Sequence, residues 1–250
     1  MNIKKLLEDE ITKKDYYEVN EDNLDPILIA QEKKDEYISL VCALFAYGNV
    51  KAIVKFLKNI DFDILEESEK EIKKYFTNHY YRFQTKEDVK EFFVTLKRLK
   101  NEDNLENIFL KGYQKNNFVI DGIDEIIKTF YKINLYISKG YSFLIGNRYK
   151  GKTKGSSPYK RWNMYLRWMV RDEGIDFGLW KKVKKSDLII PLDTHTFNVS
   201  HKLGLLTRKT YDLESAIELT NKLKEFDEFD PVKYDFAIYR LGQNDEILNF

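Results

Sequence analysis

Apolar residues recur at the spacing of an α-helix along most of the chain, and this pattern restricts the possible folds more than any other feature. The clearest apolar stripe follows a break at Gly48-Asn49 and consists of Val50, Ile53, Val54 and Leu57. Residues at positions i, i+3, i+4 and i+7 lie on one face of a helix, where they can pack against a core. No convincing series of alternating strands accompanies these stripes. The sequence therefore predicts an all-α protein.

Capping residues divide this helical pattern into segments. We expect one helix from Ile27 to Tyr47, and another from Lys86 to Leu99 that opens on a capping pair, Thr85 with Asp88. Pro158 is expected to begin a helix that ends near Arg171, because proline is favoured in the first helical turn. The inward stripe of that helix is predicted to comprise Trp162, Tyr165 or Leu166, and Met169. The opposite side is predicted to carry Lys160, Arg167 and Arg171.

Length and composition fit a single helical domain of 250 residues. No run of about 18 apolar residues is present, and the N-terminus lacks the features of a signal peptide. We therefore expect a cytoplasmic protein that does not cross a membrane. The single cysteine, Cys42, stands in an apolar run and is expected to be a buried small hydrophobic residue. Three scattered histidines and one cysteine predict no metal site.

Positive charge is concentrated in one part of the chain. Residues 139–185 contain 13 Lys and Arg and 3 Asp and Glu, a net charge of 13 − 3 = +10, whereas the whole chain carries +1. Tyrosine and tryptophan residues alternate with these basic residues. Such a mixture suits an anionic partner whose phosphates contact cations while its bases stack on rings. The alternative reading is a solvated charged face.

Two helix beginnings within or just after this basic stretch carry residues of chemical interest. Lys160 lies at the start of the helix after Pro158, and Asp193 lies at the start of the helix that Gly204 ends. Taken alone, Lys160 would be a solvated lysine and Asp193 would be an ordinary N-cap. If the two side chains are close in space, they provide a nucleophilic amine and a carboxylate that can accept its proton.

Both segments resemble signature segments of the helix-hairpin-helix base-excision DNA glycosylases. The LDTHTFNV run, residues 192–199, is similar to the family's Val-Asp-Thr-His-Val-Phe-Arg-Val, which carries the catalytic aspartate. The KRWNMYL run, residues 160–166, is similar to Lys-Thr-Ala-Asn-Val-Val-Leu, which carries the catalytic lysine of the bifunctional members. The whole sequence looks closer still to a divergent bacterial group of unassigned function, distantly related to these enzymes.

The resemblance implies two helical subdomains flanking a cleft, here residues 27–140 and residues 1–26 plus 141–250. It also implies catalytic roles for Lys160 and Asp193, no cofactor, and double-stranded DNA with a damaged or abasic nucleotide as the partner of a monomer. The residues expected to contact DNA are Lys154, Gly155, Ser156, Ser157, Tyr159, Arg161, Arg167 and His195. Tyr47 occupies the place of a family residue that often contacts DNA or the base, and is a candidate for the base pocket.

The main departure from the family lies in the hairpin. Its Leu-Pro-Gly-Val-Gly turn is replaced by KGSSP, residues 154–158, with one glycine left. Three functions therefore remain open. The first is a glycosylase, with AP-lyase activity through a Schiff base on Lys160, or without it if Asp193 steers water. The second is a non-catalytic DNA- or RNA-binding module of the same fold. The third is a helical scaffold whose basic stretch binds an acidic protein.

Overall fold

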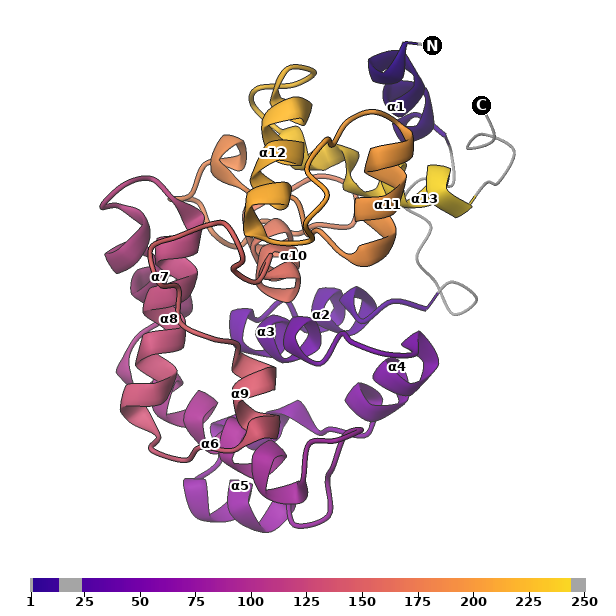
Figure 1. The fold of residues 1–250 in the computed structure, drawn as a ribbon. Helices are drawn as coiled ribbons and strands as arrows, with labels where there is room; N and C mark the ends of the chain where they lie inside the picture. The colour runs from indigo at the N-terminus through magenta and orange to yellow at the C-terminus, as the bar shows by residue number, and fades with distance from the viewer. Residues whose placement is uncertain (1, 14–23, 244–250) are drawn as a thin grey trace. The chain divides into compact units, whose positions relative to one another are not determined.

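The computed structural model describes residues 2–13 and 24–243, and over these residues the protein is helical (Figure 1). The described part contains no β-strand, and its one isolated bridge pairs Tyr81 with Gln84. Of the expected subdomain segment 1–26, residues 14–23 lie outside the described residues. The chain divides into two compact units. We name Leu24–Tyr149 the inserted unit, and Met1–Asn23 with Lys150–Phe250 the terminal unit.

The inserted unit is built from short helices around an aromatic core. Its elements are α2 (Ile27–Lys33), α3 (Glu36–Leu44), α4 (Val50–Lys58), the 3₁₀-helix η1 (Phe62–Glu66), α5 (Glu69–Tyr75), α6 (Lys86–Glu102), α7 (Leu105–Tyr113), α8 (Val119–Ile133) and α9 (Lys139–Ile145). Phe45, Phe76, Phe92, Phe93 and Phe130 are fully buried. The Phe76 and Phe93 rings stack with their centroids 4.0 Å apart. Burial of these rings supplies much of the unit's hydrophobic stabilisation.

The expected helix from Ile27 to Tyr47 is interrupted. Lys34 adopts a left-handed conformation with φ of 47°, which ends α2. Asp35 then caps α3 by accepting hydrogen bonds from the backbone N–H groups of Tyr37 and Ile38. The prediction of one continuous helix was wrong because it followed apolar spacing and overlooked the aspartate cap. The predicted break at Gly48-Asn49 is confirmed, since the Asn49 side chain caps α4.

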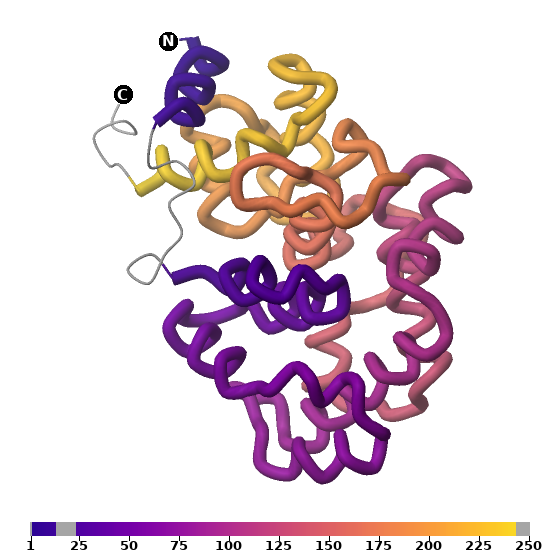
Figure 2. Tube along the Cα trace, turned by 180° about the vertical axis from the view of Figure 1, so that it is seen from behind, coloured from indigo at the N-terminus to yellow at the C-terminus, as the bar shows by residue number. Residues whose placement is uncertain are grey.

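Helices α7 and α8 lie side by side in both views (Figures 1 and 2). Two glycines permit their close approach. A Cβ atom on Gly112 would lie 2.1 Å from the carbonyl oxygen of Asp121. A Cβ atom on Gly122 would lie 2.4 Å from the Phe109 ring. Larger side chains at these positions would force the helices apart.

Asp88 joins three segments of the inserted unit. The predicted capping box is confirmed, because Thr85 N–H donates to the Asp88 carboxylate while Asp88 N–H donates to the Thr85 hydroxyl. The hydroxyl groups of Thr85, Tyr136 and Ser138 also donate to this carboxylate. Burial alone would raise the pKa of Asp88, but the hydrogen bonds from Ser138, Thr85 and Tyr136 outweigh it and lower the pKa.

The terminal unit combines residues from the two ends of the described chain. Its elements are α1 (Ile3–Ile11), α10 (Lys160–Val170), the 3₁₀-helix η2 (Lys185–Asp187), α11 (Thr194–Lys202), α12 (Leu213–Lys224), the 3₁₀-helix η3 (Pro231–Tyr234) and α13 (Asp235–Gln243). Helix α1 lies beside α13, as seen from behind in Figure 2. Glu8 on α1 accepts a hydrogen bond from the Tyr234 hydroxyl and lies 3.2 Å from the Lys233 ammonium.

We expect Asp88→Ala to lower the free energy of unfolding of the inserted unit by about 3 kcal/mol, since four donated hydrogen bonds are lost and buried hydroxyl groups lose their acceptor. Urea unfolding followed by far-UV circular dichroism measures the loss, and hydrogen–deuterium exchange locates it at α6 and α9. Glu87→Ala is the matched control, because Glu87 is exposed and pairs only with Lys90 on the same helix. A loss as small as that of the control would contradict the role of Asp88.

Candidate active site

Lys160 is the first residue of α10, two residues after the predicted start at Pro158. Pro158 itself is buried and lies outside the helix, and Tyr159 takes the capping position with φ of 51°. The expectation that Pro158 begins the helix was therefore wrong. The Lys160 side chain is half-buried, and its Nζ atom lies 3.8 Å from the Met164 sulfur, one turn along the helix.

Asp193 is the N-cap of α11, as predicted. Its Oδ1 atom accepts a hydrogen bond of 2.8 Å from the backbone N–H of Thr196. The residue before it, Leu192, is fully buried, so the start of α11 is held against the core of the unit. Tyr211 lies next to this cap and donates a hydrogen bond to the Leu192 carbonyl. Burial, followed by the negative charge of Asp193, raises the pKa of Tyr211 to about 12.

Asp235, the first residue of α13, is a third charged residue near Lys160 and Asp193. Its carboxylate accepts a hydrogen bond from the Arg167 guanidinium. Burial raises the pKa of Asp235, the charges of Arg167 and Lys160 lower it, and the charge of Asp193 raises it, with a net upward shift. Lys160 and Asp193 both contribute to the pKa shift of Asp235, so each lies in the electrostatic surroundings of this carboxyl.

Asp235 was not among the predicted site residues. Residues 232–241 have the pattern of one helix, in which this aspartate would be an unremarkable interior residue. The chain instead forms the short 3₁₀-helix η3 and begins α13 at Asp235. The only signal in the sequence was Asp230-Pro231, which marked a helix start nearby but not the change of helix type.

Arg167 of α10 and Arg171, the residue after its end, are buried, contrary to the expected outward face. The exposed fractions of Arg167 and Arg171 are 4% and 2%. Arg167 bonds to Asp176 and Asp235, and Arg171 bonds to Asp176 and Asp230. Buried charges are costly unless paired, and these ion pairs neutralise both guanidinium groups. This burial argues against a contact between Arg167 and DNA, because its guanidinium is occupied by internal carboxylates.

The turn formed by residues 154–158 is bound to the start of α12. Gly155, with φ of +74°, donates its backbone N–H to the Asp212 carboxylate at 2.8 Å. The Ser156 carbonyl accepts from the N–H of Leu213 at 2.9 Å. An N–H group that could hold a DNA phosphate is therefore already bonded to an internal carboxylate. The expectation that Gly155 contacts DNA through this N–H conflicts with that arrangement.

The other predicted DNA contacts differ in their exposure. Lys154 and Ser157 are exposed, Ser156 and Arg161 are half-buried, and Tyr159 is buried. The Ser156 hydroxyl donates to the Lys152 carbonyl at 2.6 Å, and the Ser157 hydroxyl accepts from the Tyr159 N–H at 3.3 Å. His195 is half-buried, with its Nε2 atom 3.0 Å from the Tyr239 carbonyl oxygen. Lys154 thus has the most accessible cation among these positions.

Tyr47, the candidate for the base pocket, belongs to the inserted unit. Its ring lies against three other aromatic rings, with centroid distances of 5.1 Å to Tyr81, 5.8 Å to Phe83 and 5.0 Å to Phe143. Its hydroxyl bonds to Gln84. Tyr47 is therefore part of an aromatic cluster rather than an isolated side chain.

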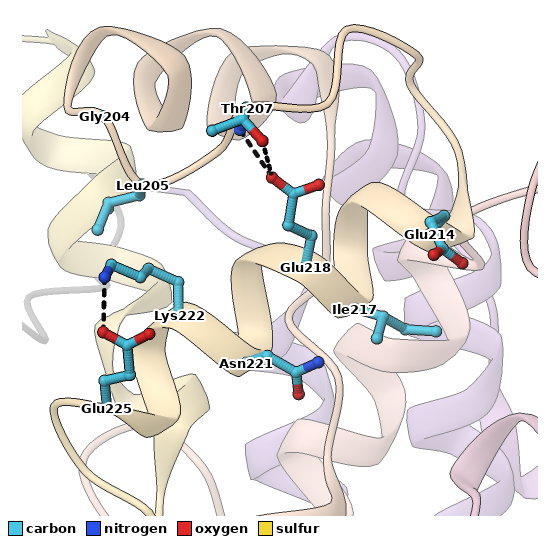
Figure 3. Close-up of a pocket in the computed structure, with 9 residues that line it drawn as sticks. All are labelled: Gly204, Leu205, Thr207, Glu214, Ile217, Glu218, Asn221, Lys222 and Glu225. Atoms are coloured by element: carbon cyan, nitrogen blue, oxygen red, sulfur yellow. Dashed lines mark hydrogen bonds and ion pairs between the residues drawn. The ribbon is translucent and has the colours of Figure 1, made fainter.

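A hollow of about 520 Å³ lies between α12 and the loop from Gly204 to Thr207 (Figure 3). Its lining includes none of the predicted site residues. Thr207 donates its N–H and its hydroxyl to Glu218, both at 2.7 Å, and Lys222 pairs with Glu225. These polar side chains are bonded to one another, so the hollow offers no evident binding chemistry.

Within residues 2–13 and 24–243, no group of three or more His, Cys, Asp and Glu side chains is arranged to hold a metal ion. Across the same residues, no helix combines the length and the apolar character that a membrane crossing requires.

The lowered pKa of Asp212 predicts that the free energy of unfolding depends on pH. The Arg208 guanidinium lowers the pKa of Asp212 to about 2 against the opposing effect of burial, and the N–H groups of Gly155 and Ser215 contribute. A carboxyl whose pKa is lower in the folded state than in the unfolded state, where it is 3.8, stabilises the fold above pH 4 and loses this contribution as the pH falls towards 2. We expect Asp212→Asn to lower the free energy of unfolding by about 1–2 kcal/mol at pH 7 and to flatten its decline in acid.

All three tryptophans lie in the terminal unit, so tryptophan fluorescence during urea unfolding at several pH values reports this effect. Glu225→Gln on α12 is the matched control, since Glu225 is exposed and pairs with Lys222. If the free energy of unfolding varied with pH in the same way in the wild type and in Asp212→Asn, the lowered pKa of Asp212 would not contribute to stability.

The comparison with known proteins identifies one family. A family model described as "Protein of unknown function (DUF2400)" matches residues 25–244. No curated protein and no solved structure matches the chain. The matched segment covers nearly all of the chain and includes Lys160, Asp193 and Asp235. The chain therefore belongs to the DUF2400 family.

Proposed function

We propose that the protein is a DNA base-excision glycosylase with AP-lyase activity, in which Lys160 is the nucleophile and Asp193 is the assisting carboxylate. The observation that supports this most strongly is that Lys160 and Asp193 both lie in the electrostatic surroundings of Asp235. The resemblance of residues 160–166 and 192–199 to the helix-hairpin-helix glycosylases supports the same assignment. In this proposal the helices of the chain take the two-subdomain arrangement of those enzymes.

The residues suit the chemistry. Lys160 attacks C1′ of a flipped nucleotide with the electron pair of its neutral amine, and the C1′–N bond breaks as the base departs with that bond's electrons. Asp193 stabilises the positive charge that develops on the sugar. Opening of the sugar ring gives a Schiff base between Lys160 and C1′. Loss of a C2′ proton then permits β-elimination of the 3′ phosphate.

The attacking amine must first lose a proton, and in this proposal the Asp193 carboxylate accepts it. One oxygen of Asp193 accepts the hydrogen bond that caps α11, which fixes the orientation of the carboxylate. Asp235 accepts a hydrogen bond from Arg167, and the charges of Lys160 and Asp193 affect its pKa. We assign Asp235 as a positioning residue, which sets the local charge around Lys160 and Asp193 without contacting the nucleotide.

The surface charge of the terminal unit supports an anionic partner. Arg167 and Arg171 form ion pairs with internal carboxylates, but several lysines of the basic stretch are exposed. These are Lys150, Lys152, Lys154, Lys181, Lys182 and Lys184. Lysines at a protein surface bind phosphates by releasing condensed counterions, and the resulting affinity falls steeply with salt.

Borohydride trapping tests the proposal. We expect a covalent adduct between the protein and a duplex containing an abasic site, because borohydride reduces the Schiff base to a stable amine. Lys160→Gln should abolish the adduct. Lys209→Gln should retain most of it, since that variant loses the same charge at an exposed position of the same unit. Gel electrophoresis of the reduced mixture separates the adduct from free DNA.

Two further variants refine the result. Asp193→Asn should slow trapping by about 100-fold or more, as expected when a group that stabilises developing charge is lost. Asp235→Asn should slow it by about tenfold and change its pH profile, because the carboxyl beside Lys160 and Asp193 no longer titrates. Absence of an adduct with a plain abasic duplex at low salt would reject the lyase activity. Release of a damaged base without an adduct would indicate a glycosylase that uses water.

A second candidate function is a non-catalytic DNA- or RNA-binding module of the same fold. The bond from the Gly155 N–H to Asp212 favours it, because that bond removes a phosphate donor from the hairpin position. Nucleic-acid binding that weakens steeply with salt, is unchanged in Asp193→Asn and yields no adduct or free base would favour this candidate.

A further inference from the structure

A tight turn in the inserted unit projects side chains from a fixed base. Tyr81 and Gln84 exchange backbone hydrogen bonds of 2.9 and 3.3 Å, and Arg82 between them has φ of 54°. The Tyr81 hydroxyl donates to the Tyr47 carbonyl at 2.7 Å, and the Gln84 amide donates to the Gly140 carbonyl at 3.2 Å. These bonds hold the turn in place while Arg82 and the residue after it face solvent.

Aromatic rings gather at this turn and are exposed to an unusual degree. Phe83 is 51% exposed and Phe143 of α9 is 44% exposed. Their ring centroids are 4.7 Å apart, and the half-buried Tyr47 ring contacts both. We name Tyr47, Phe83 and Phe143 the aromatic platform. Adjacent exposed rings on a fixed support are typical of a binding surface.

The charge around the platform is positive. The Arg82 guanidinium lies 5.6 Å from the centre of the Tyr47 ring. Lys139 is exposed and stands one helical turn before Phe143, on the same face of α9. Two acidic residues follow the turn in sequence, but Asp88 is buried under donated hydrogen bonds and Glu87 pairs with Lys90. The platform therefore combines ring faces with cations.

This combination matches one class of ligand. Unpaired nucleobases stack on aromatic side chains, and the phosphates on either side of a base bind lysine and arginine. An apolar protein segment would use the rings but would have no need of the cations, and an acidic peptide would need cations more than ring faces. We propose that the aromatic platform binds single-stranded nucleic acid by stacking an unpaired base on Phe83 and Phe143, with Arg82 and Lys139 at the flanking phosphates. This site lies wholly in the inserted unit and does not depend on the chemistry of Lys160.

Fluorescence anisotropy with a labelled oligothymidine of about 12 nucleotides at low salt tests the proposal on the full chain. We expect Phe83→Ala to weaken binding by roughly 5- to 100-fold, the range for loss of one stacked ring. Phe83→Tyr keeps the ring and should bind like the wild type. Phe83→Leu keeps an apolar side chain without a ring face and should lose about as much affinity as Phe83→Ala.

Phe229→Ala is the matched control, because Phe229 is 73% exposed but belongs to the terminal unit. It should leave binding unchanged. Wild-type affinity in Phe83→Ala, or full affinity in Phe83→Leu, would overturn the stacking site. Absence of oligonucleotide binding at low salt would also overturn it and would leave the platform to a protein partner.

Discussion

The organisation of the terminal unit depends on a buried network of ion pairs. Arg167 lies on α10 and Arg171 directly follows it. Their charges are neutralised by Asp176, Asp230 and Asp235. Leaving any of these charges buried without a partner would cost several kcal/mol, so the network fixes α10 relative to the start of α13. The charge of Lys160 also acts on Asp235.

This network connects a structural requirement to the proposed chemistry. A lysine is a useful nucleophile only if it is held near groups that can take its proton and oppose the charge of the transition state. Asp193 is held by the cap of α11, and Asp235 is held by Arg167. Both carboxylates lie at the beginning of a helix, Asp193 as the cap of α11 and Asp235 as the first residue of α13. The turn at Gly155 is held as well, but by Asp212, and a nucleic-acid partner would have to reach the unit through its exposed lysines.

Local signals in the sequence predicted local structure well. The caps at Asn49, Thr85 and Asp193 each depend on a side chain that bonds to a backbone N–H two or three residues ahead. The pattern of residues is therefore enough to find them. The class of fold followed from the same periodicity, since helical stripes occurred throughout and alternating stripes did not.

Contacts between residues that are distant in the sequence could not be predicted from such local patterns. Arg167 and Arg171 fall opposite the apolar stripe of α10, so spacing alone predicted exposure. Their partners Asp230 and Asp235 lie about sixty residues further along the chain. The role of Asp235 as a partner of Arg167 follows only from the folded structure. The break at Lys34 was missed for a different reason. Apolar residues occur at helical spacing on both sides of Lys34, so the pattern does not indicate that one helix ends and another begins there.

The most direct test of the central claim is to identify the amino acid that becomes attached to DNA. The protein is incubated with an abasic duplex and borohydride, the adduct is digested with nuclease and protease, and the modified peptide is sequenced by mass spectrometry. We predict that the reduced sugar remnant is found on the side chain of Lys160. A remnant on Lys154, on another lysine or on the N-terminal amine would contradict the assignment of Lys160 as the nucleophile.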